Sequence, residues 1–362
     1  MTTEAEPLAL DEQKRDALAE RLFLSGLAGL EILTVYLGKE LGYYDVLATK
    51  PHTARELADA TGTTERYARE WLEQQAAAGI IEHENNGESR FWLSPEGAEV
   101  LVNEESLSFM AWLPRFQLSW GSQVPALLKA FHDGSGIPYA DYGLDMVLGQ
   151  AGANRPAFMK QLATEWLPKV PGLLERLQRP GARIADIGCG TGWSTIALGQ
   201  AFPGVIVDGY DLDETSIQLA EENLRSSGID TRVTFHRRDV ATLDAGEAYD
   251  LITIFEALHD LSRPIEFLAS ARRCLADDGY LIVMDERVAE TFEAPTDEVE
   301  RFMYACSVLH CLPASLAEYP SAATGTVIRP DVVREYARQA GFREVEILPI
   351  ETDFFRFYLL RP

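Results

Sequence analysis

The sequence predicts an α/β protein, with a doubly wound parallel sheet in its C-terminal half and helices through most of its N-terminal half. From Arg183 onward, apolar runs of strand length alternate with helical segments, as they do where crossover helices join parallel strands. The first of these strands leads directly into a glycine turn and a helix. Further upstream, residues 53–93 have the pattern of two short helices followed by a hairpin. We therefore expect a sheet domain preceded by a smaller helical domain.

Composition and charge exclude several classes of partner. A chain of 362 residues with 46% hydrophobic and 25% charged residues is typical of a soluble globular protein of two or three domains. Its formal net charge of −25 repels phosphate backbones and anionic lipid surfaces. We therefore expect no nucleic acid and no membrane as partners. The acidity itself fits either an acidic proteome or a saline habitat.

The cysteines and the apolar segments predict a cytoplasmic protein. Four cysteines are too few for a disulfide framework. Cys306, His310 and Cys311 lie close together, but they lack a second ligand pair at zinc-finger spacing, so we expect buried thiols and no metal. The most apolar stretch, residues 22–37, contains Glu31 and is expected to be too short and too charged to span a bilayer. The N-terminus carries no basic region of the kind that opens a signal peptide.

The N-terminal segments predict a winged helix behind a helical lead. Residues up to about Leu47 carry apolar side chains at helical spacing. Residues 53–62 form a short helix that ends in a glycine turn, and residues 64–78 form a second helix. Apolar residues then flank the turn at residues 84–87, whose Asn-Gly pair is a hairpin signal.

The charge of this winged helix favours a protein partner over DNA. From Thr53 to Leu93, four basic residues stand against eight acidic ones, a net charge of −4. A recognition helix needs Lys or Arg for phosphates and usually Arg or Asn for base edges. We therefore expect the domain to mediate dimerisation rather than DNA binding.

Residues from about 104 to 180 are helical and rich in aromatic side chains. Aromatic residues at helical spacing usually belong to the core, yet this segment has enough rings to line a cavity as well. We expect a linker or lid that contributes four residues to a substrate pocket: Trp112, Phe116, Tyr139 and Tyr142.

The second half of the chain supplies the sheet. The expected strands cover residues 184–187, 205–210, 233–238, 250–255, 280–285, 344–348 and 354–360. The expected helices among them cover residues 193–202, 215–227 and 264–275, with a later helix from Pro330. Only a short loop separates the last two strands, so they are expected to be antiparallel, while the rest are parallel.

The turn between the first strand and its helix is the most informative feature of the chain. Its spacing is G-x-G-x-G, and Trp193 stands where the dinucleotide fingerprint G-x-G-x-x-G has its last glycine. Asp186, two residues before Gly188, adds an anion that would repel a pyrophosphate and suits a cationic amino group. The turn therefore favours S-adenosylmethionine over a nicotinamide cofactor, and so disfavours a dehydrogenase.

Acidic residues end the next two strands. Asp211 follows Gly192 by nineteen residues, a distance that suits a carboxylate for ribose hydroxyls, although Asp213 could instead cap the next helix. Asp239 could accept a hydrogen bond from an adenine amino group, and Val240 could pack on the ring. The glycine turn, Asp211 and Asp239 follow three successive strands in the order that a nucleoside site requires, so we do not expect these two acids to be ordinary turn residues.

Asp-x-Gly-x-Gly-x-Gly with the two later acids resembles the class I S-adenosylmethionine-dependent methyltransferases over about the second half of the chain. With the winged helix, the chain resembles small-molecule O-methyltransferases of secondary metabolism. The resemblance implies a Rossmann-like sheet of order 3-2-1-4-5-7-6, a homodimer through residues 1–103, a linker over 104–180 and a cofactor domain over 181–362. It also implies a cofactor site from these residues: Asp186, Gly188, Cys189, Gly190, Thr191, Gly192, Asp211, Leu212, Asp239, Val240 and Phe255.

The catalytic candidates follow the fourth strand. His259-Asp260 matches the His-Asp-Trp segment of the similar O-methyltransferases, with Leu261 in place of Trp, and the resemblance implies that His259 is the general base. Independently, histidine titrates near neutral pH without assistance, as the base for a hydroxyl should. The acid that orients this histidine cannot be aligned from the sequence, and Glu318 is one candidate.

Two further carboxylates and a later helix complete the predicted site. Glu256 and Asp285, at the ends of the fourth and fifth strands, are reserve bases if the acceptor is an amine. The resemblance places the region after the fifth strand at the substrate pocket, where four residues are candidate walls: Met303, Tyr304, Ser307 and His310.

The predicted function is methyl transfer to a small, mostly apolar or aromatic acceptor, most simply a hydroxyl, with S-adenosylhomocysteine as the product. N- or C-methylation on the same fold, and a ligand-sensing regulator that uses the winged helix, are the alternatives.

Overall fold

The computed structural model describes residues 9–229, 232–239 and 248–362. The chain divides into two compact units, Met1–Pro114 and Arg115–Pro362.

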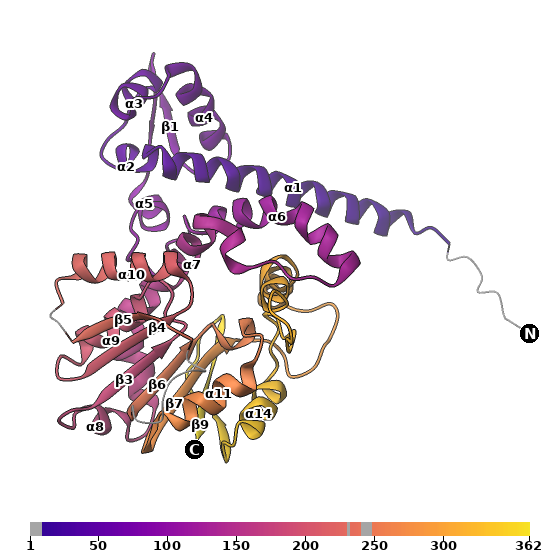
Figure 1. Ribbon diagram of the computed structural model, residues 1–362. Helices are drawn as coiled ribbons and strands as arrows, with labels where there is room; N and C mark the ends of the chain where they lie inside the picture. The colour runs from indigo at the N-terminus through magenta and orange to yellow at the C-terminus, as the bar shows by residue number, and fades with distance from the viewer. Residues whose placement is uncertain (1–8, 230–231, 240–247) are drawn as a thin grey trace, which may run out of the picture. The chain divides into compact units, whose positions relative to one another are not determined.

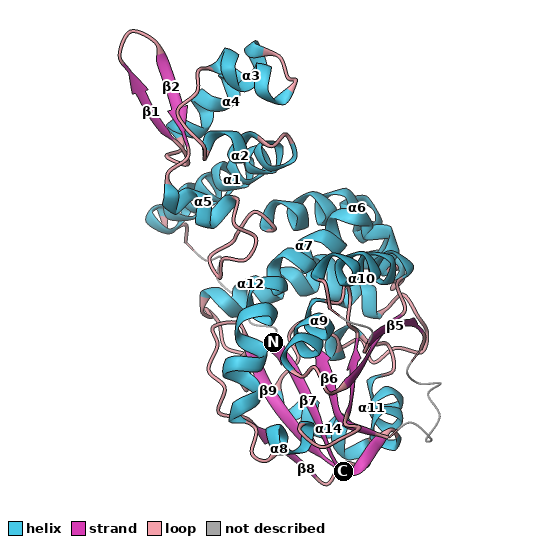
Figure 2. Ribbon diagram, turned by 90° about the vertical axis from the view of Figure 1, so that its left-hand side faces the viewer, coloured by secondary structure: helices cyan, strands magenta, loops and turns pink. Residues whose placement is uncertain are grey.

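The first unit is a winged helix behind a long N-terminal helix. Its elements are α1 (Glu12–Glu40), α2 (Tyr43–Leu47), α3 (Ala54–Thr61), α4 (Glu65–Ala77), β1 (Glu82–Asn85), β2 (Ser89–Trp92) and α5 (Pro95–Leu101). A capping box of Thr53 and Glu56 starts α3, and Gly62 at φ 68° ends it. The antiparallel hairpin β1–β2 forms the wing, as Figure 2 shows. The predicted winged helix is confirmed.

Helix α1 exposes an unusual amount of apolar surface. Its 29 residues include one stretch long and apolar enough to cross a membrane by length and composition, and only 11% of that stretch is buried. The expectation that the apolar stretch at residues 22–37 is too short and too charged to span a bilayer was wrong by these two criteria, because the helix continues on both sides of that stretch. Its exposed apolar side chains include Leu18, Leu22, Phe23, Leu24, Leu27, Leu30, Leu33 and Leu37.

The second unit opens with helices that precede the sheet. They are α6 (Leu113–Asp133, which begins at the end of the first unit), η1 (Tyr139–Tyr142), α7 (Gly143–Ala157), the π-helix η2 (Phe158–Trp166), η3 (Leu167–Lys169) and α8 (Leu173–Leu177). Leu162 and Trp166 of η2 pack into a core that also contains Ile196 and Phe357 of the sheet half. These helices thus belong to the same compact unit as the sheet.

Seven strands form one sheet in the order β5-β4-β3-β6-β7-β9-β8, which confirms the expected 3-2-1-4-5-7-6 arrangement (Figure 1). The strands are β3 (Arg183–Ile187), β4 (Ile206–Asp211), β5 (Val233–Arg237), β6 (Tyr249–Phe255), β7 (Leu275–Glu286), β8 (Glu344–Ile347) and β9 (Phe355–Arg361). Only β9 runs antiparallel to its neighbours, β7 and β8.

Helices cover both faces of this sheet. Ile184 of β3 belongs to one core, whereas Ala185 and Ile187 belong to the other, as expected for a parallel strand buried on both faces. The helices are α9 (Trp193–Ala201), α10 (Glu214–Ser227), η5 (Leu258–Asp260), α11 (Pro264–Arg273), α12 (Glu298–Cys306), η6 (Ser307–Cys311), α13 (Leu312–Ser315) and α14 (Pro330–Gln339). Because β3 pairs in parallel with β4 and β6, the loops that follow these three strands lie at the same end of the sheet.

Candidate functional site

The glycine turn between β3 and α9 has a backbone conformation that disfavours side chains, and two of its three glycines also lack the space for one. Gly188, Gly190 and Gly192 all have positive φ, at 72°, 51° and 82°. A Cβ on Gly188 would lie 2.6 Å from the Cβ of Ala257, and one on Gly192 would lie 2.4 Å from Cζ of Phe235. Gly190 faces open space, since a Cβ there would have no heavy atom of the described residues within 4 Å beyond its chain neighbours. The backbone at Gly190 is therefore accessible to a ligand.

Strand β4 holds this turn in place. The N–H groups of Gly188 and Cys189 donate to the carbonyl of Tyr210, at 2.8 and 3.0 Å. The N–H of Gly190 donates to Oδ2 of Asp211 at 2.8 Å. The carboxylate predicted for the ribose thus lies against the glycine turn itself.

Asp213 takes the capping role that the sequence left open. Its side chain accepts from the N–H of Ser216 at 2.7 Å and caps α10, while Asp211 accepts from the N–H of Asp213 at 2.9 Å. The alternative in which Asp213 caps the helix is confirmed, and Asp211 remains the acid at the turn.

The carboxylate of Asp186 is bound by hydroxyl groups of the protein, whereas the sequence predicted a cationic group of a ligand as its partner. Its buried carboxylate accepts hydrogen bonds from the hydroxyls of Ser194 and Thr195, both at 2.6 Å, and of Thr253 at 2.7 Å. These bonds tie β3 to the first turn of α9 and to β6. Asp186 therefore positions the glycine turn, and its contact with a cofactor stays a prediction.

The remaining predicted cofactor residues surround the same turn or end nearby strands. Cys189 and Thr191 are buried in the turn, whereas Leu212, after β4, is 56% exposed. Phe255 ends β6 and stacks on Phe158, with ring centroids 5.6 Å apart. Asp239 is half-buried two residues after β5, and Val240 lies outside the described residues.

Helix α7 contributes polar groups that sequence reasoning missed. The amides of Gln150 and Asn154 donate to Oε2 of Glu256 at 2.5 and 3.2 Å. The guanidinium of Arg155 lies 4.2 Å from the ring centroid of Trp193, the first residue of α9. The signal in the sequence was the pair of amides four residues apart, which places both on one helix face.

Glu256 is a strained and buried acid at the end of β6. Its φ of 51° is unusual for a residue with a side chain, and such strain costs about 1–3 kcal/mol. Burial, partly opposed by the Asn154 amide and the charge of His259, raises the pKa of Glu256 to about 7. Its Oε1 is buried and accepts no hydrogen bond from the described residues. Buried acids with raised pKa values cluster at functional sites.

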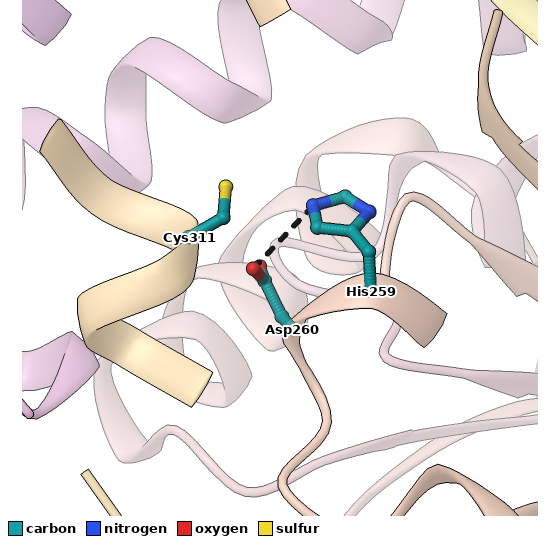
Figure 3. Close-up of side chains that lie close together, drawn as sticks. All are labelled: His259, Asp260 and Cys311. Atoms are coloured by element: carbon teal, nitrogen blue, oxygen red, sulfur yellow. Dashed lines mark ion pairs between the residues drawn. The ribbon is translucent and has the colours of Figure 1, made fainter. Parts of the chain in front are cut away.

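His259 is held by Asp285 rather than by Glu318. Its Nδ1 donates to Oδ1 of Asp285 at 2.7 Å, and both side chains are buried. Asp285 lies near the end of β7, and Glu318 is exposed. Because Asp285 occupies Nδ1, Nε2 is the nitrogen left for chemistry, 3.4 Å from Oδ1 of Asp260 (Figure 3).

The charges around His259 favour its protonated form. Burial lowers the pKa of His259, but the carboxylates of Asp285 and Asp260, together with Cys311, raise it well above the ordinary value of 6.5. Glu286 lies in the same group, and burial raises its pKa as well. Asp285 Oδ2 and Glu286 Oε2 are buried without a hydrogen-bond partner among the described residues. The ends of these strands thus carry several carboxylate oxygens that could accept a hydrogen bond from a ligand.

Three of the predicted substrate residues pack together. The ring of His310 makes edge contacts with Tyr139 and Tyr142, at centroid distances of 5.6 and 4.5 Å. The hydroxyl of Tyr142 donates to the carbonyl of Leu309 at 2.9 Å. Burial lowers the pKa of His310 to about 4, so its ring is neutral at neutral pH.

The other predicted substrate residues make separate contacts. Phe116 is buried and stacks on Trp120, with centroids 4.9 Å apart. Met303 is buried, Ser307 lies close to Gly325, and the hydroxyl of Tyr304 accepts from Arg329 at 3.1 Å. Trp112 lies in the first unit, where its indole donates to the carbonyl of Phe109 at 2.8 Å.

All four cysteines are free and buried: Cys189, Cys274, Cys306 and Cys311. The expected buried thiols are confirmed.

The chain matches two family models. Residues 178–340 match a methyltransferase domain, and residues 28–103 match an Rv2258c-like winged HTH domain. The chain is an S-adenosylmethionine-dependent methyltransferase. The methyltransferase domain spans the glycine turn, the acids after β4 and β5, and His259 with Asp285.

Known methyltransferases resemble about half of this chain in sequence and most of it in fold. The ubiquinone biosynthesis O-methyltransferase of Aromatoleum aromaticum is 29% identical over 190 residues, which cover 52% of this chain and 72% of that protein. Human N-acetylserotonin methyltransferase in complex with SAM has a TM-score of 0.71 at 15% identity, covering 98% of this chain and 99% of that one. The N,N-8-amino-8-demethyl-D-riboflavin dimethyltransferase of Streptomyces davawensis has a TM-score of 0.63 at 19% identity, covering 95% and 98%. S-adenosylmethionine is the cofactor of this methyltransferase.

Proposed function

We propose that this methyltransferase moves the methyl group to a hydroxyl of a small, mostly apolar or aromatic acceptor, with His259 as the general base. The observation that carries the proposal is the bond between Nδ1 of His259 and Asp285. It fixes the ring at the strand end next to the glycine turn, since β6 pairs with β3. A carboxylate on Nδ1 is the arrangement that prepares Nε2 of a histidine to take a proton.

When bound, S-adenosylmethionine supplies an electrophilic methyl group on a sulfonium. The chain's residues hold the reactants in line and manage one proton. Asp211 and the backbone around Gly190 would hold the nucleoside, and Nε2 of His259 would take the acceptor's hydroxyl proton as the O–CH₃ bond forms and the S–CH₃ bond breaks. Alignment is the larger contribution, at about 7–11 kcal/mol, and the base adds about 10²–10⁴-fold.

The dependence of kcat/KM on pH should reveal the pKa of the general base. Because His259 must be deprotonated to act, we expect kcat/KM to rise with pH through a pKa above 6.5 and then level off. In Asp285→Asn, loss of the carboxylate charge lowers the pKa of His259, so the rise should move to lower pH while the plateau falls. Initial rates between pH 5 and 10 measure both. A rise that stays in place in Asp285→Asn would exclude His259 as the titrating group.

A second candidate is methylation of an amine. The buried, unpartnered Oε1 of Glu256 and its pKa of about 7 favour an acceptor with N–H groups. The dimethyltransferase from Streptomyces davawensis is named for a reaction at nitrogen on this fold. In that case Glu256 or Asp285 would serve as the base. C-methylation has no such observation in its favour.

The winged helix is assigned to assembly rather than to DNA. Its four arginines all form ion pairs with glutamates: Arg55–Glu65, Arg66–Glu70, Arg69–Glu65 and Arg90–Glu56. Paired in this way, they offer little to a phosphate backbone. Tight, sequence-selective binding in a gel-shift assay at low salt would overturn this assignment and restore the regulator hypothesis.

We assign the apolar surface of α1 to a second copy of the chain. The double variant Leu22→Glu/Leu30→Glu should convert a dimer into a monomer, because each side chain is more than 60% exposed in the single chain and would be covered in the dimer. Light scattering after size exclusion measures the change. Leu128→Glu, at a leucine that is 63% exposed on α6, is the matched control and should stay dimeric.

A monomeric wild-type protein would contradict the dimer. Flotation of the wild type with lipid vesicles, lost in the double variant, would assign α1 to a membrane surface instead. A cytoplasmic location and a role in secondary metabolism stay predictions.

A further inference from the structure

Two chemically different side chains, those of Asp260 and Cys311, lie close to Nε2 of His259. This nitrogen, a carboxylate oxygen of Asp260 and Sγ of Cys311 all lie within 4.8 Å of one another. His259 and Asp260 belong to η5, and Cys311 ends η6, about 50 residues later in the chain. Figure 3 shows the three side chains together, with the histidine ring facing the Asp260 carboxylate and the thiol alongside. The proposed methyl transfer uses Nε2 but gives Cys311 no role.

These donors form the set that a zinc-class cation selects. Imidazole nitrogen, thiolate sulfur and carboxylate oxygen are the protein ligands of Zn²⁺. Three protein ligands leave a fourth position of a tetrahedral site for water or another donor.

Two further observations separate this cluster from a chance grouping. Nδ1 of His259 is bonded to Asp285 at 2.7 Å, the second contact that metal-ligating histidines almost always make. Oδ1 of Asp260 is buried and accepts no hydrogen bond among the described residues, although it points at Nε2 from 3.4 Å. A buried oxygen of this kind is costly unless a cation or a donor satisfies it.

We propose that His259, Asp260 and Cys311 form a binding site for a thiophilic divalent cation of the zinc class, and that occupancy of this site inhibits methyl transfer. The inhibitory part rests on the proposed role of His259 as base. A cation on Nε2 takes the lone pair that would accept the acceptor's proton. Binding releases the protons of the Cys311 thiol and of His259 to solvent as metal–sulfur and metal–nitrogen bonds form, without oxidation or reduction.

Cobalt and zinc ions test the site on the full-length protein. Titration of chelator-treated protein with Co²⁺ should show one equivalent per chain with a thiolate-to-cobalt absorption band. Cys311→Ser should abolish that band and weaken Zn²⁺ binding, measured by competition, by at least about tenfold. Cys306→Ser makes the same change at a neighbouring buried thiol outside the cluster and should bind like the wild type. Cofactor binding and thermal unfolding show that each variant is folded.

Methyl transfer tests the consequence. Zn²⁺ should inhibit the wild type and Cys306→Ser, a chelator should restore each rate, and Cys311→Ser should need at least about tenfold more Zn²⁺ for half inhibition. If Cys311→Ser binds Co²⁺ and Zn²⁺ as the wild type does, the proposed cation site is wrong. If Zn²⁺ binds at Cys311 but does not inhibit methyl transfer, the proposed inhibitory role is wrong.

Separate results would contradict the role of His259 as base and the presence of a cation site. If His259→Asn retains the wild-type rate without metal while Co²⁺ still gives a Cys311-dependent band in the wild type, the base is wrong and the cation site stands. If His259→Asn is inactive but no Co²⁺ binds, the base stands and the cation site is wrong.

Discussion

Replacing His259 with asparagine lowers kcat for a phenolic acceptor by about 10²–10⁴-fold. The variant keeps a polar side chain near Asp285 but loses the nitrogen that receives the proton. Affinity for S-adenosylhomocysteine should change little, since the glycine turn and Asp211 are untouched. Initial rates with methyl-labelled cofactor at saturating acceptor measure the loss in kcat.

His236 provides the matched control for this substitution. Its Nε2 also faces a carboxylate, Asp208, at 3.2 Å, but it lies on β5 and outside the proposed site. His236→Asn should retain a rate close to that of the wild type. If His259→Asn loses less than tenfold, alignment alone accounts for the reaction and the base hypothesis fails.

Asp211→Ala should weaken binding of S-adenosylhomocysteine by about 10–100-fold. The substitution removes the acceptor for the N–H groups of Gly190 and Asp213 and the carboxylate predicted for the ribose. Hydrogen bonds to a charged group contribute about 1.5–3 kcal/mol, which corresponds to that change in the dissociation constant. Isothermal titration calorimetry measures it directly.

Asp213→Ala is the control two residues away. It removes the cap of α10 and should lower the free energy of unfolding by about 1 kcal/mol while cofactor affinity stays within a few-fold of the wild type. Unchanged affinity in Asp211→Ala would mean that the nucleoside lies elsewhere.

The sheet and the glycine turn were predictable because their signals are local. Each parallel strand is a short apolar run bounded by polar residues, and the positive φ at Gly188, Gly190 and Gly192 follows from a turn that only glycine adopts easily. The antiparallel last strand followed from its short loop. β7 begins five residues earlier than expected, at Leu275, where it pairs with Tyr249 across a register shift.

The partners of the site residues were not predictable from local signals. Asp285 lies beside His259 because β7, which carries Asp285, pairs with β6, the strand that precedes His259. Nδ1 of His259 and Oδ1 of Asp285 are 2.7 Å apart although the two residues are 26 positions apart in the sequence. The three hydroxyls on Asp186 come from α9 and β6, and the amides on Glu256 come from α7. Such contacts depend on the packing of distant segments, which a single sequence leaves open.

The exposed apolar surface of α1 shows a related limit. Its composition is equally compatible with a protein interface and with a lipid surface. The sequence analysis considered only residues 22–37, whereas the helix spans Glu12–Glu40. Charge favoured a protein partner, and the oligomeric state decides between the two.

The atom that receives the methyl group decides whether the enzyme methylates a hydroxyl. Purified enzyme is incubated with ¹³C-methyl-labelled S-adenosylmethionine and a matched pair of aromatic acceptors, one with a hydroxyl and one with an amino group at the same position. We predict label on the oxygen of the first acceptor, and loss of this label in His259→Asn. Label on the nitrogen of the second, with none on oxygen, would contradict this prediction.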